Sequence, residues 1–489
     1  MVMLRSFLLV SISTLIVAGC DAGSSSATDD GADATPHALK GCSVDPSVSS
    51  KIAPGGYYTN GATVCTANGS PHLFHGVDRP SLEWDPKGEA KGGQGIPRSD
   101  FDAMAAWHAN VVRIALNQDF WLSGAALYVP AYQATVDQAV KDAEAAGLDV
   151  ILDLHWSDRG DLSVSVAGQG QGKAGHADQQ QMADVNSKQF WLEVASKYKN
   201  DGHVLFELYN EPHDVSWSAW LNGGTVGGYQ VVGMQQLYDT VRNDAGADNI
   251  VIAGGVSWAF DLSGASSNRI RGYNIMYATH PYYPQDAEVL WDGKFGYLAA
   301  HDIAPVIATE FGDTSTGCTG AWDSQLVQYA DARQISWTAW AWWTAGCSFP
   351  ALISDWDYTP TKQGAAIKAV LLNYPYQPAG VPSPATGSGG SGGTSGGGGA
   401  AGAGGGHSGA SGANSNAGAG GVSGHAGTGG ANTGGSSGSG TSGAAGVGGS
   451  VSSAGGGGSS AGTAGGSSAG TAGANTGGVG GAAGTSGAN

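Results

Sequence analysis

The sequence predicts an α/β protein that forms a single (β/α)8 barrel, or TIM barrel, followed by a disordered tail. Short runs rich in Val, Ile and aromatic residues alternate with amphipathic segments along residues 43–379. Eight such runs can be counted, whereas a doubly wound sheet normally has fewer strands and a Gly-rich first turn. Residues 380–489 contain no charged and no aromatic side chain. We therefore expect the folded core to lie within residues 43–379.

The expected strands are nearly continuous in apolar residues, which is typical of parallel strands buried on both faces. They are expected at 72–78, 111–116, 149–155, 203–210, 249–255, 275–282, 305–311 and 336–342. Amphipathic segments between them predict helices at 98–108, 132–146, 184–198, 229–243 and 321–333, and after the last strand at 361–372.

The N-terminus has the pattern of an export signal. Residues 1–19 begin with a basic residue, Arg5, and continue with an apolar run that is too short for a stable membrane span. The sequence Val17-Ala18-Gly19-Cys20 resembles a bacterial lipoprotein signal, and this implies cleavage before Cys20 and lipidation of its thiol. We expect an exported protein, anchored in a bacterial membrane or at the cell surface. A plain secretory signal, with release of the protein, is the alternative.

Two segments are expected to lack a folded core. Residues 20–42 are rich in Ser, Ala, Asp and Gly, and we interpret them as a tether. Residues 380–489 are a low-complexity run of mainly Gly, Ala, Ser, Thr and Asn. Such a run buries too little apolar surface to offset the entropy of ordering the chain, so it is expected to be disordered.

The charge limits the class of partner. The chain of 489 residues has a formal net charge of −19, which excludes a general electrostatic attraction to nucleic acid or anionic lipid. A neutral substrate fits this balance, with membrane contact only through the N-terminal lipid. No HExxH helix or CxxC pair is present, so we expect neither metal nor cofactor. We expect a monomer.

Cysteine usage agrees with export. When Cys20 is set aside, Cys42, Cys65, Cys318 and Cys347 remain, an even number that suits an oxidising compartment. Three pairings are possible. Sequence proximity favours Cys42 with Cys65 and Cys318 with Cys347.

Polar and aromatic side chains gather where the expected strands end. In barrels of this class the catalytic groups lie at the C-terminal ends of the strands. The residues found there include Arg113, His155, Asn210, Glu211, His280, Tyr282, Glu310 and Trp340. Two carboxyl groups among sugar-stacking aromatic residues, with no phosphate-binding loop, suit glycoside hydrolysis.

At these residues the chain resembles glycoside hydrolase family 5, in its endoglucanase-type branch. Asn210-Glu211-Pro212 is similar to the family's acid/base motif, and Thr309-Glu310-Phe311-Gly312 is similar to its nucleophile motif. Four other segments match in the same order: Val111-Val112-Arg113-Ile114, Asp153-Leu154-His155-Trp156, His280-Pro281-Tyr282 and Trp337-Thr338-Ala339-Trp340. The resemblance covers about residues 74–372. Thr309 departs from the Gly that is common before the nucleophile.

The resemblance implies a role for each matched residue. Glu211 would act as acid and then base, and Glu310 as nucleophile. Arg113 and Tyr282 would hold the Glu310 carboxylate, and Asn210 the sugar 2-hydroxyl. His155 and His280 would bond sugar hydroxyls and the nucleophile, and Trp340 would lie under the sugar at the cleavage point. Trp342 and Trp343 are alternatives for that platform, Trp84, Trp121 and Trp217 could extend the cleft, and Glu207 is expected to be a polar group of the barrel interior.

The sequence thus predicts a retaining endo-β-1,4-glucanase, a cellulase whose partner is a β-1,4-glucan polysaccharide. A β-mannanase or another β-glycanase on the same barrel is the alternative within the enzyme class. A carbohydrate-binding surface lipoprotein without catalysis is the alternative outside it. The paired Glu residues and their Arg, His and Tyr partners argue against the latter, because a binding protein does not need them.

Overall fold

The structure, a computed structural model, describes residues 42, 51–90, 93, 95–168, 170 and 172–375. The expected signal peptide, Cys20, almost all of the expected tether and the low-complexity tail lie outside the described residues. Within the described ranges no helix combines the length and the apolar character that crossing a membrane requires.

Eight parallel strands of the described chain close into a barrel, as the sequence predicts. In chain order they are β4 (His75–Arg79), β5 (Val111–Asn117), β6 (Asp149–Trp156), β9 (Val204–Glu207), β12 (Val251–Gly254), β13 (Ile275–Thr279), β15 (Val306–Ala308) and β17 (Ser336–Ala339). The last strand pairs in parallel with the first, Trp337 opposite His75, and this closes the barrel. The C-terminal ends of all eight strands therefore open on one side of the molecule.

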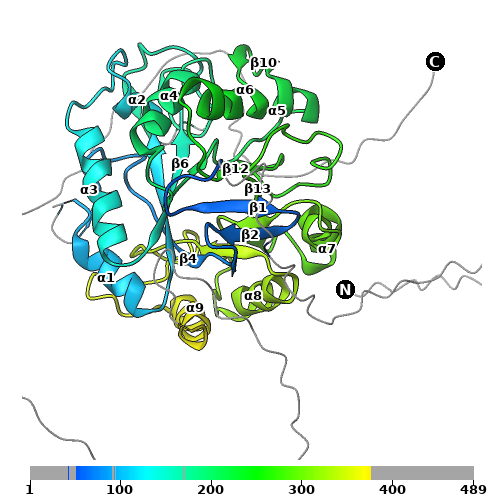
Figure 1. Ribbon diagram of the computed structural model, residues 1–489. Helices are drawn as coiled ribbons and strands as arrows, with labels where there is room; N and C mark the ends of the chain where they lie inside the picture. The colour runs from blue at the N-terminus through cyan, green and yellow to red at the C-terminus, as the bar shows by residue number, and fades with distance from the viewer. Residues whose placement is uncertain are drawn as a thin grey trace, which may run out of the picture. The chain divides into compact units, whose positions relative to one another are not determined.

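Helices surround the strands (Figure 1). The longer ones are α1 (Arg98–Ala106), α3 (Tyr132–Ala145), α4 (Ser187–Tyr198), α8 (Ala321–Arg333) and α9 (Lys362–Asn373), with α6 (Met234–Asp239) continuing into the π-helix η1 (Thr240–Asp244). Short helices occur in the loops: α2 (Gln118–Trp121), α5 (Trp217–Asn222), η2 (Glu288–Leu290), η3 (Asp292–Gly296) and α7 (Tyr297–Ala300). The side chain of Thr361 caps α9 by accepting a hydrogen bond from the amide of Gly364, at 2.9 Å.

The expected helix over 229–243 is wrong in its first part. Residues Tyr229–Val231 form strand β11, which pairs antiparallel with β10 (Gly224–Val226), and the helix begins only after Gly233. Gly227 and Gly228 join the two strands with φ of +58° and +85°. Glycine adopts these angles without steric cost, so the Gly-Gly pair makes a tight hairpin turn in place of a helical start.

A small antiparallel sheet closes the N-terminal end of the barrel. It consists of β1 (Tyr57–Asn60), β2 (Thr63–Thr66) and β3 (Pro71–His72), so His72 lies outside the first barrel strand, in which we had placed it. Figure 1 shows β1 and β2 crossing the barrel. Tyr57 and Val64 share an apolar cluster with Phe74 and other barrel-strand residues. The Tyr57 hydroxyl donates to Asp149 Oδ2 at 2.6 Å. With this end covered, the opposite end is left to hold a site.

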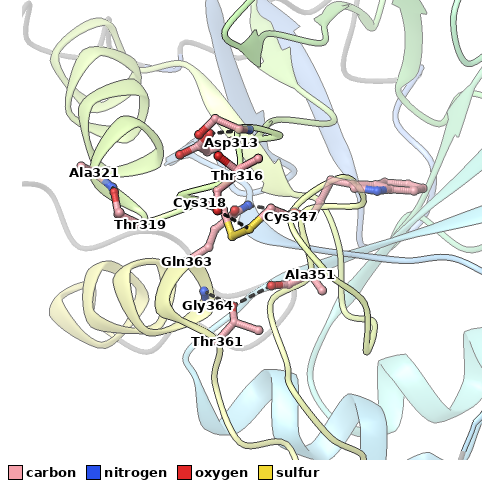
Figure 2. Close-up of a disulfide and its surroundings, with 12 residues drawn as sticks. Asp313, Thr316, Cys318, Thr319, Ala321, Cys347, Ala351, Thr361, Gln363 and Gly364 are labelled. Carbon is pink, nitrogen blue, oxygen red and sulfur yellow. Dashed lines mark hydrogen bonds between the residues drawn. A yellow bond between two sulfur atoms is a disulfide. The ribbon is translucent and has the colours of Figure 1, made fainter.

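Among the described residues two disulfides are present, in the pairing that sequence proximity favours. Cys42 is bonded to Cys65 in β2, with their Cα atoms 5.8 Å apart. Cys318 is bonded to Cys347 with a Cα separation of 5.5 Å. Figure 2 shows that this second bridge joins the loop before α8 to the loop after β17, next to the start of α9. The second disulfide therefore links two loops on the C-terminal face of the barrel.

Candidate active site

Arg113, on β5, lies at the centre of a buried charge cluster inside the barrel. Its side chain has no exposed surface and contacts four carboxyl groups. Nε lies 2.6 Å from Glu207 Oε2, and Nη1 lies 2.7 Å from Glu310 Oε1. Nη1 is also 3.5 Å from Asp78 Oδ1, and Nη2 is 3.0 Å from Asp153 Oδ2. Burial alone would lower the pKa of Arg113, but these carboxyl groups outweigh it and raise the pKa.

The carboxyl groups around Arg113 respond differently to burial. Burial raises the pKa of Asp78 and of Asp153 well above the usual value, although Arg113 acts against it. Burial would also raise the pKa of Glu207, but Arg113 and His280 outweigh it and lower the pKa to about 2. Glu207 is therefore a buried carboxylate that is fully paired, which agrees with its expected place in the barrel interior.

Glu310 follows β15 and is held at both carboxylate oxygens. Oε1 accepts from Arg113 Nη1 at 2.7 Å, and Oε2 accepts from the hydroxyl of Tyr282 at 2.7 Å. Burial and the nearby carboxylates Glu310 and Glu211 raise the pKa of Tyr282 well above its usual value, so this hydroxyl stays protonated and can donate. The two donors, one at each oxygen, fix the orientation of the Glu310 carboxylate.

Glu211 lies beyond the end of β9 and is more open to solvent. Its side chain is 15% exposed, against 5% for Glu310. Oε1 lies 2.9 Å from His280 Nδ1, and Oε2 accepts from Gln179 Nε2 at 2.5 Å. One carboxylate oxygen of each Glu and one ring nitrogen of His280 lie within 4.8 Å of one another. These three residues could also ligate a metal ion, although in this structure His280 is hydrogen-bonded to Glu211.

The hydrogen bonds of His280 define its tautomer. Thr309 donates its hydroxyl proton to Glu207 Oε1 at 2.7 Å, so its oxygen can only accept from His280 Nε2, at 2.9 Å. Nε2 therefore carries a hydrogen, and Nδ1 is left to share a proton with Glu211. Burial would lower the pKa of His280, but Glu310, Glu207 and Glu211 raise it to about 10. His280 Nδ1 lies 3.7 Å from Glu310 Oε2, so its hydrogen bond is to Glu211 and not to Glu310 as we had expected.

His155 differs from His280 in its protonation state, because its ring is neutral. Its Nδ1 lies 2.6 Å from Asp153 Oδ2, an oxygen that also accepts from Arg113. Burial lowers the pKa of His155 to about 4, so the ring is neutral and Nδ1 carries the hydrogen. Its Nε2 lies 3.5 Å from Asn210 Nδ2. Nε2 is thus an acceptor, which can receive a hydrogen bond from a hydroxyl group.

Aromatic rings line the same end of the barrel. Trp340 is stacked with His155 at a centroid separation of 5.8 Å, and it contacts Phe349. Trp84 contacts Trp156 and Trp343, and all three rings are partly exposed.

Two tryptophans named from the sequence do not reach this surface. Trp121 is 1% exposed and packs against Tyr132 and Phe190, while Trp342 is fully buried. Trp121 and Trp342 therefore stabilise the interior and do not extend the cleft. Trp217 is partly exposed and packs against Trp220 and the core.

Two residues of the site were not identified from the sequence. Trp258, in the loop that follows β12, is 41% exposed and is stacked on His213 with ring centroids 3.6 Å apart. It follows an expected strand end, and the barrel rule could have found it. Gln179 lies in the long loop between β6 and α4, where no periodic pattern marks it.

Comparison with known proteins identifies a family that matches the chain. The family model Cellulase (glycosyl hydrolase family 5) matches residues 67–346. The chain is 24% identical over 346 residues to a cellulase of Thermoanaerobacterium, covering 65% of this chain and 80% of that protein. It is 26% identical over 332 residues to Endoglucanase C of Evansella cellulosilytica, covering 62% of this chain but only 38% of that protein.

Solved structures agree as well. A β-glucanase of Saccharophagus degradans in complex with cellotetraose is 25% identical, with a TM-score of 0.50, and the match covers 65% of this chain and 93% of that one. A hyperthermophilic endocellulase of Pyrococcus horikoshii, 15% identical, shares the fold with a TM-score of 0.51 over 66% of this chain and all of that one. The chain belongs to glycosyl hydrolase family 5, the cellulase family.

Proposed function

We propose that this protein is a retaining endo-β-1,4-glucanase. The observation that carries the proposal is that a carboxylate oxygen of Glu211 and one of Glu310 lie within 4.8 Å of each other. Retaining glycosidases place their two carboxyl groups about 5–5.5 Å apart, whereas inverting enzymes need roughly 6.5–9.5 Å to admit a water molecule. The narrow separation supports a double displacement through a covalent intermediate.

The hydrogen bonds support a division of roles between the two carboxyl groups. Glu310 is the nucleophile, because Arg113 and Tyr282 donate to its two oxygens and hold the carboxylate in one orientation. Glu211 is the acid and then the base, because it is more open and shares a proton with His280. In the first step Glu310 attacks the anomeric carbon while Glu211 protonates the departing oxygen. In the second step Glu211 removes a proton from water, which displaces Glu310.

A β-1,4-glucan is the proposed substrate. The relatives are named as cellulases and endoglucanases, and one similar structure holds cellotetraose. Aromatic rings with exposed surface at this end of the barrel, Trp258, Trp84, Trp156 and Trp343, suit the flat faces of glucose units. Trp258 lies on the Glu211 side, since its amide donates to the carbonyl of Pro212 at 3.0 Å. It would therefore contact the sugar that departs.

One assay tests this proposal. Reducing-sugar release would be measured on carboxymethylcellulose, mixed-linkage β-glucan, xylan and glucomannan, with Glu310→Ala as the inactive control. We expect the first two to be cleaved fastest, with an early loss of viscosity that marks internal cleavage. Faster release from glucomannan than from either glucan would favour a β-mannanase. No release from any of the four would leave a carbohydrate-binding protein.

We also propose that the protein is exported and carries a lipid on Cys20. The short apolar segment ending at Val17-Ala18-Gly19-Cys20 supports this, and so do the two disulfides, which are stable in oxidising compartments. Labelling with a radioactive fatty acid in a bacterial host should mark the wild type and not Cys20→Ser. Unlabelled wild-type protein, cut at another position and free in the medium, would contradict the lipid anchor.

A further inference from the structure

Gln179 reaches the proposed acid/base from a loop that carries none of the residues assigned above. Its side chain is 9% exposed and contacts two neighbouring residues of the segment after β9. Nε2 donates to Glu211 Oε2 at 2.5 Å, and Oε1 accepts from Asn210 Nδ2 at 3.0 Å. We propose that Gln179 is a positioning residue that orients Glu211 and stabilises its carboxylate as the proton leaves. This inference rests on the proposed function.

The orientation of the Gln179 amide follows from its neighbours. Arg113 has donors only, so Asn210 Oδ1, 2.6 Å from Arg113 Nη2, must accept. The Asn210 amide nitrogen then faces Gln179 and donates to its oxygen. This leaves the Gln179 nitrogen to face Glu211. A chain of hydrogen bonds thus runs from Arg113 through Asn210 and Gln179 to Glu211, and Arg113 also binds Glu310.

The backbone around Gln179 is attached to the segment that carries Glu211. The hydroxyl of Tyr209 donates to the carbonyl of Gln180 at 2.8 Å, and the amide of His213 donates to the carbonyl of Gln181 at 3.0 Å. On the other side of Gln179, Ser157 and Asp178 exchange two backbone hydrogen bonds of 3.1 and 3.0 Å. The amide is therefore held in place before any substrate arrives, which is the condition for a preorganised contact.

The contact fixes the orientation of the Glu211 carboxyl group. Oε2 accepts the N–H of Gln179 and Oε1 is hydrogen-bonded to His280 Nδ1, so each oxygen has a partner. As Glu310 attacks the anomeric carbon, the electrons of the breaking C–O bond pass to the departing oxygen, which takes the carboxyl proton of Glu211. Glu211 becomes a carboxylate. A hydrogen bond to a charged acceptor is about twice as strong as one to a neutral acceptor, so the Gln179 contact strengthens along the reaction.

The test uses Gln179→Met, which keeps the volume and removes both hydrogen bonds, with Gln179→Ala as a second variant. The matched control is Gln181→Ala, which removes a partly exposed amide of the same loop and keeps the backbone bond to His213. The kcat/KM would be compared on phenyl and 2,4-dinitrophenyl β-cellobiosides. Circular dichroism and the thermal midpoint report whether each variant is folded.

On the phenyl substrate we expect Gln179→Met to lose about 10- to 100-fold in kcat/KM, the effect of one hydrogen bond to a charged group. On the dinitrophenyl substrate, which needs little protonation, the loss should be under about 3-fold. Equal losses on both substrates, or an equal effect of Gln181→Ala, would overturn the positioning role. Wild-type protein that cleaves neither substrate would instead contradict the proposed function, so the two failures are distinguishable.

Discussion

The hydroxyl of Tyr282 lies 2.7 Å from Oε2 of Glu310, while the other oxygen of this carboxylate is bonded to Arg113. The two donors come from different strands, since Tyr282 follows β13 and Arg113 lies on β5. The Glu310 carboxylate is thus oriented by two hydrogen bonds, one at each of its oxygens.

For Tyr282→Phe we expect kcat to fall by about 10- to 100-fold, because one hydrogen bond to a charged group is lost. The change in KM and in thermal midpoint should be small, since the ring keeps its packing. The kinetics on soluble β-glucan measure this. The adjacent Tyr283, 39% exposed, is the matched control, and Tyr283→Phe should behave as wild type. A similar kcat in Tyr282→Phe and wild type would contradict the role of the hydroxyl.

Removal of each of the two carboxyl groups should impair catalysis in a different way. Glu310→Ala should lower kcat by several orders of magnitude on every substrate, because no covalent intermediate can form. Glu211→Ala should still react with an activated aryl glycoside, and azide should restore turnover by attacking the intermediate without a general base.

The configuration of the rescued product checks the assignment. Azide should release the β-glycosyl azide from Glu211→Ala, which NMR identifies, and it should not yield that product from Glu310→Ala. Formation of the α-azide by Glu211→Ala would reverse the two roles. An inverted product from the wild type would contradict the double displacement and both roles with it.

Trp258 should act on the sugar that departs. Trp258→Ala is expected to raise KM on long β-glucan by about 10-fold, the scale of one lost aromatic stacking contact. Trp258→Phe should restore most of the affinity. On 2,4-dinitrophenyl cellobioside, which has no sugar on that side, both variants should match the wild type. An equal loss on the aryl substrate would place Trp258 elsewhere in the binding cleft.

The barrel could be predicted because the same pattern of residues repeats along the chain. Each parallel strand is an apolar run, and polar residues follow at its end, so His155, Asn210, Glu310 and the others were found by position. The cluster around Arg113 could not be predicted in the same way. It depends on register, such as Asp78 opposite Arg113 and Asp153 opposite Glu207, and apolar runs do not specify the register between strands.

Of two features that were not predicted, one had a local sequence signal and the other had none. Asn60-Gly61 between β1 and β2 is a strong hairpin signal, with Gly61 at φ +59°. The strands were predicted from the apolar runs of a barrel, and that pattern does not reveal a sheet outside the barrel. Gln179 had no signal at all. Its position depends on contacts from Tyr209 and His213, far along the chain, and these exist only once the barrel has formed.

The disulfide between Cys318 and Cys347 should stabilise the two loops that it joins (Figure 2). Replacing both by Ala should lower stability by about 3–4 kcal/mol, the loop-closure entropy of a bridge of this span. The control removes Cys42–Cys65, whose sequence separation is 23 residues against 29. The two double variants should lose similar thermal stability by calorimetry. Only the variant without the Cys318–Cys347 bridge should lose activity faster on warming. Equal activity losses would show that the Cys318 bridge has no local effect.

Glu83 should make stability depend on pH. Its side chain is buried in the loop after β4, where Oε2 accepts from the amide of Ser81 at 2.7 Å and Oε1 has no hydrogen-bond partner in the described part of the chain. Burial, with a smaller contribution from Asp153 and Glu310, raises its pKa from 4.5 to about 8. The folded state therefore binds this proton more tightly than the unfolded state.

The sign of the effect follows from linkage. With a folded pKa above the unfolded one, the Glu83 contribution to stability is largest below pH 4.5, declines as the pH rises towards 8, and is constant beyond that. Burial also raises the pKa of Asp119 to about 8 and that of Asp286 to about 6, and these add in the same direction. Burial lowers the pKa of His72 and His155 to about 4 and that of His75 to about 3, and these groups act in the opposite direction below pH 6.5. In the wild type we therefore expect the thermal midpoint to fall by several degrees between pH 6.5 and pH 8. Glu83→Gln carries no ionisable group there, so its midpoint should fall less over this range, while Glu89→Gln, a partly exposed carboxyl of the same loop, should follow the wild type. Parallel curves for Glu83→Gln and the wild type, measured at constant ionic strength, would show that Glu83 is ionised within the fold at neutral pH.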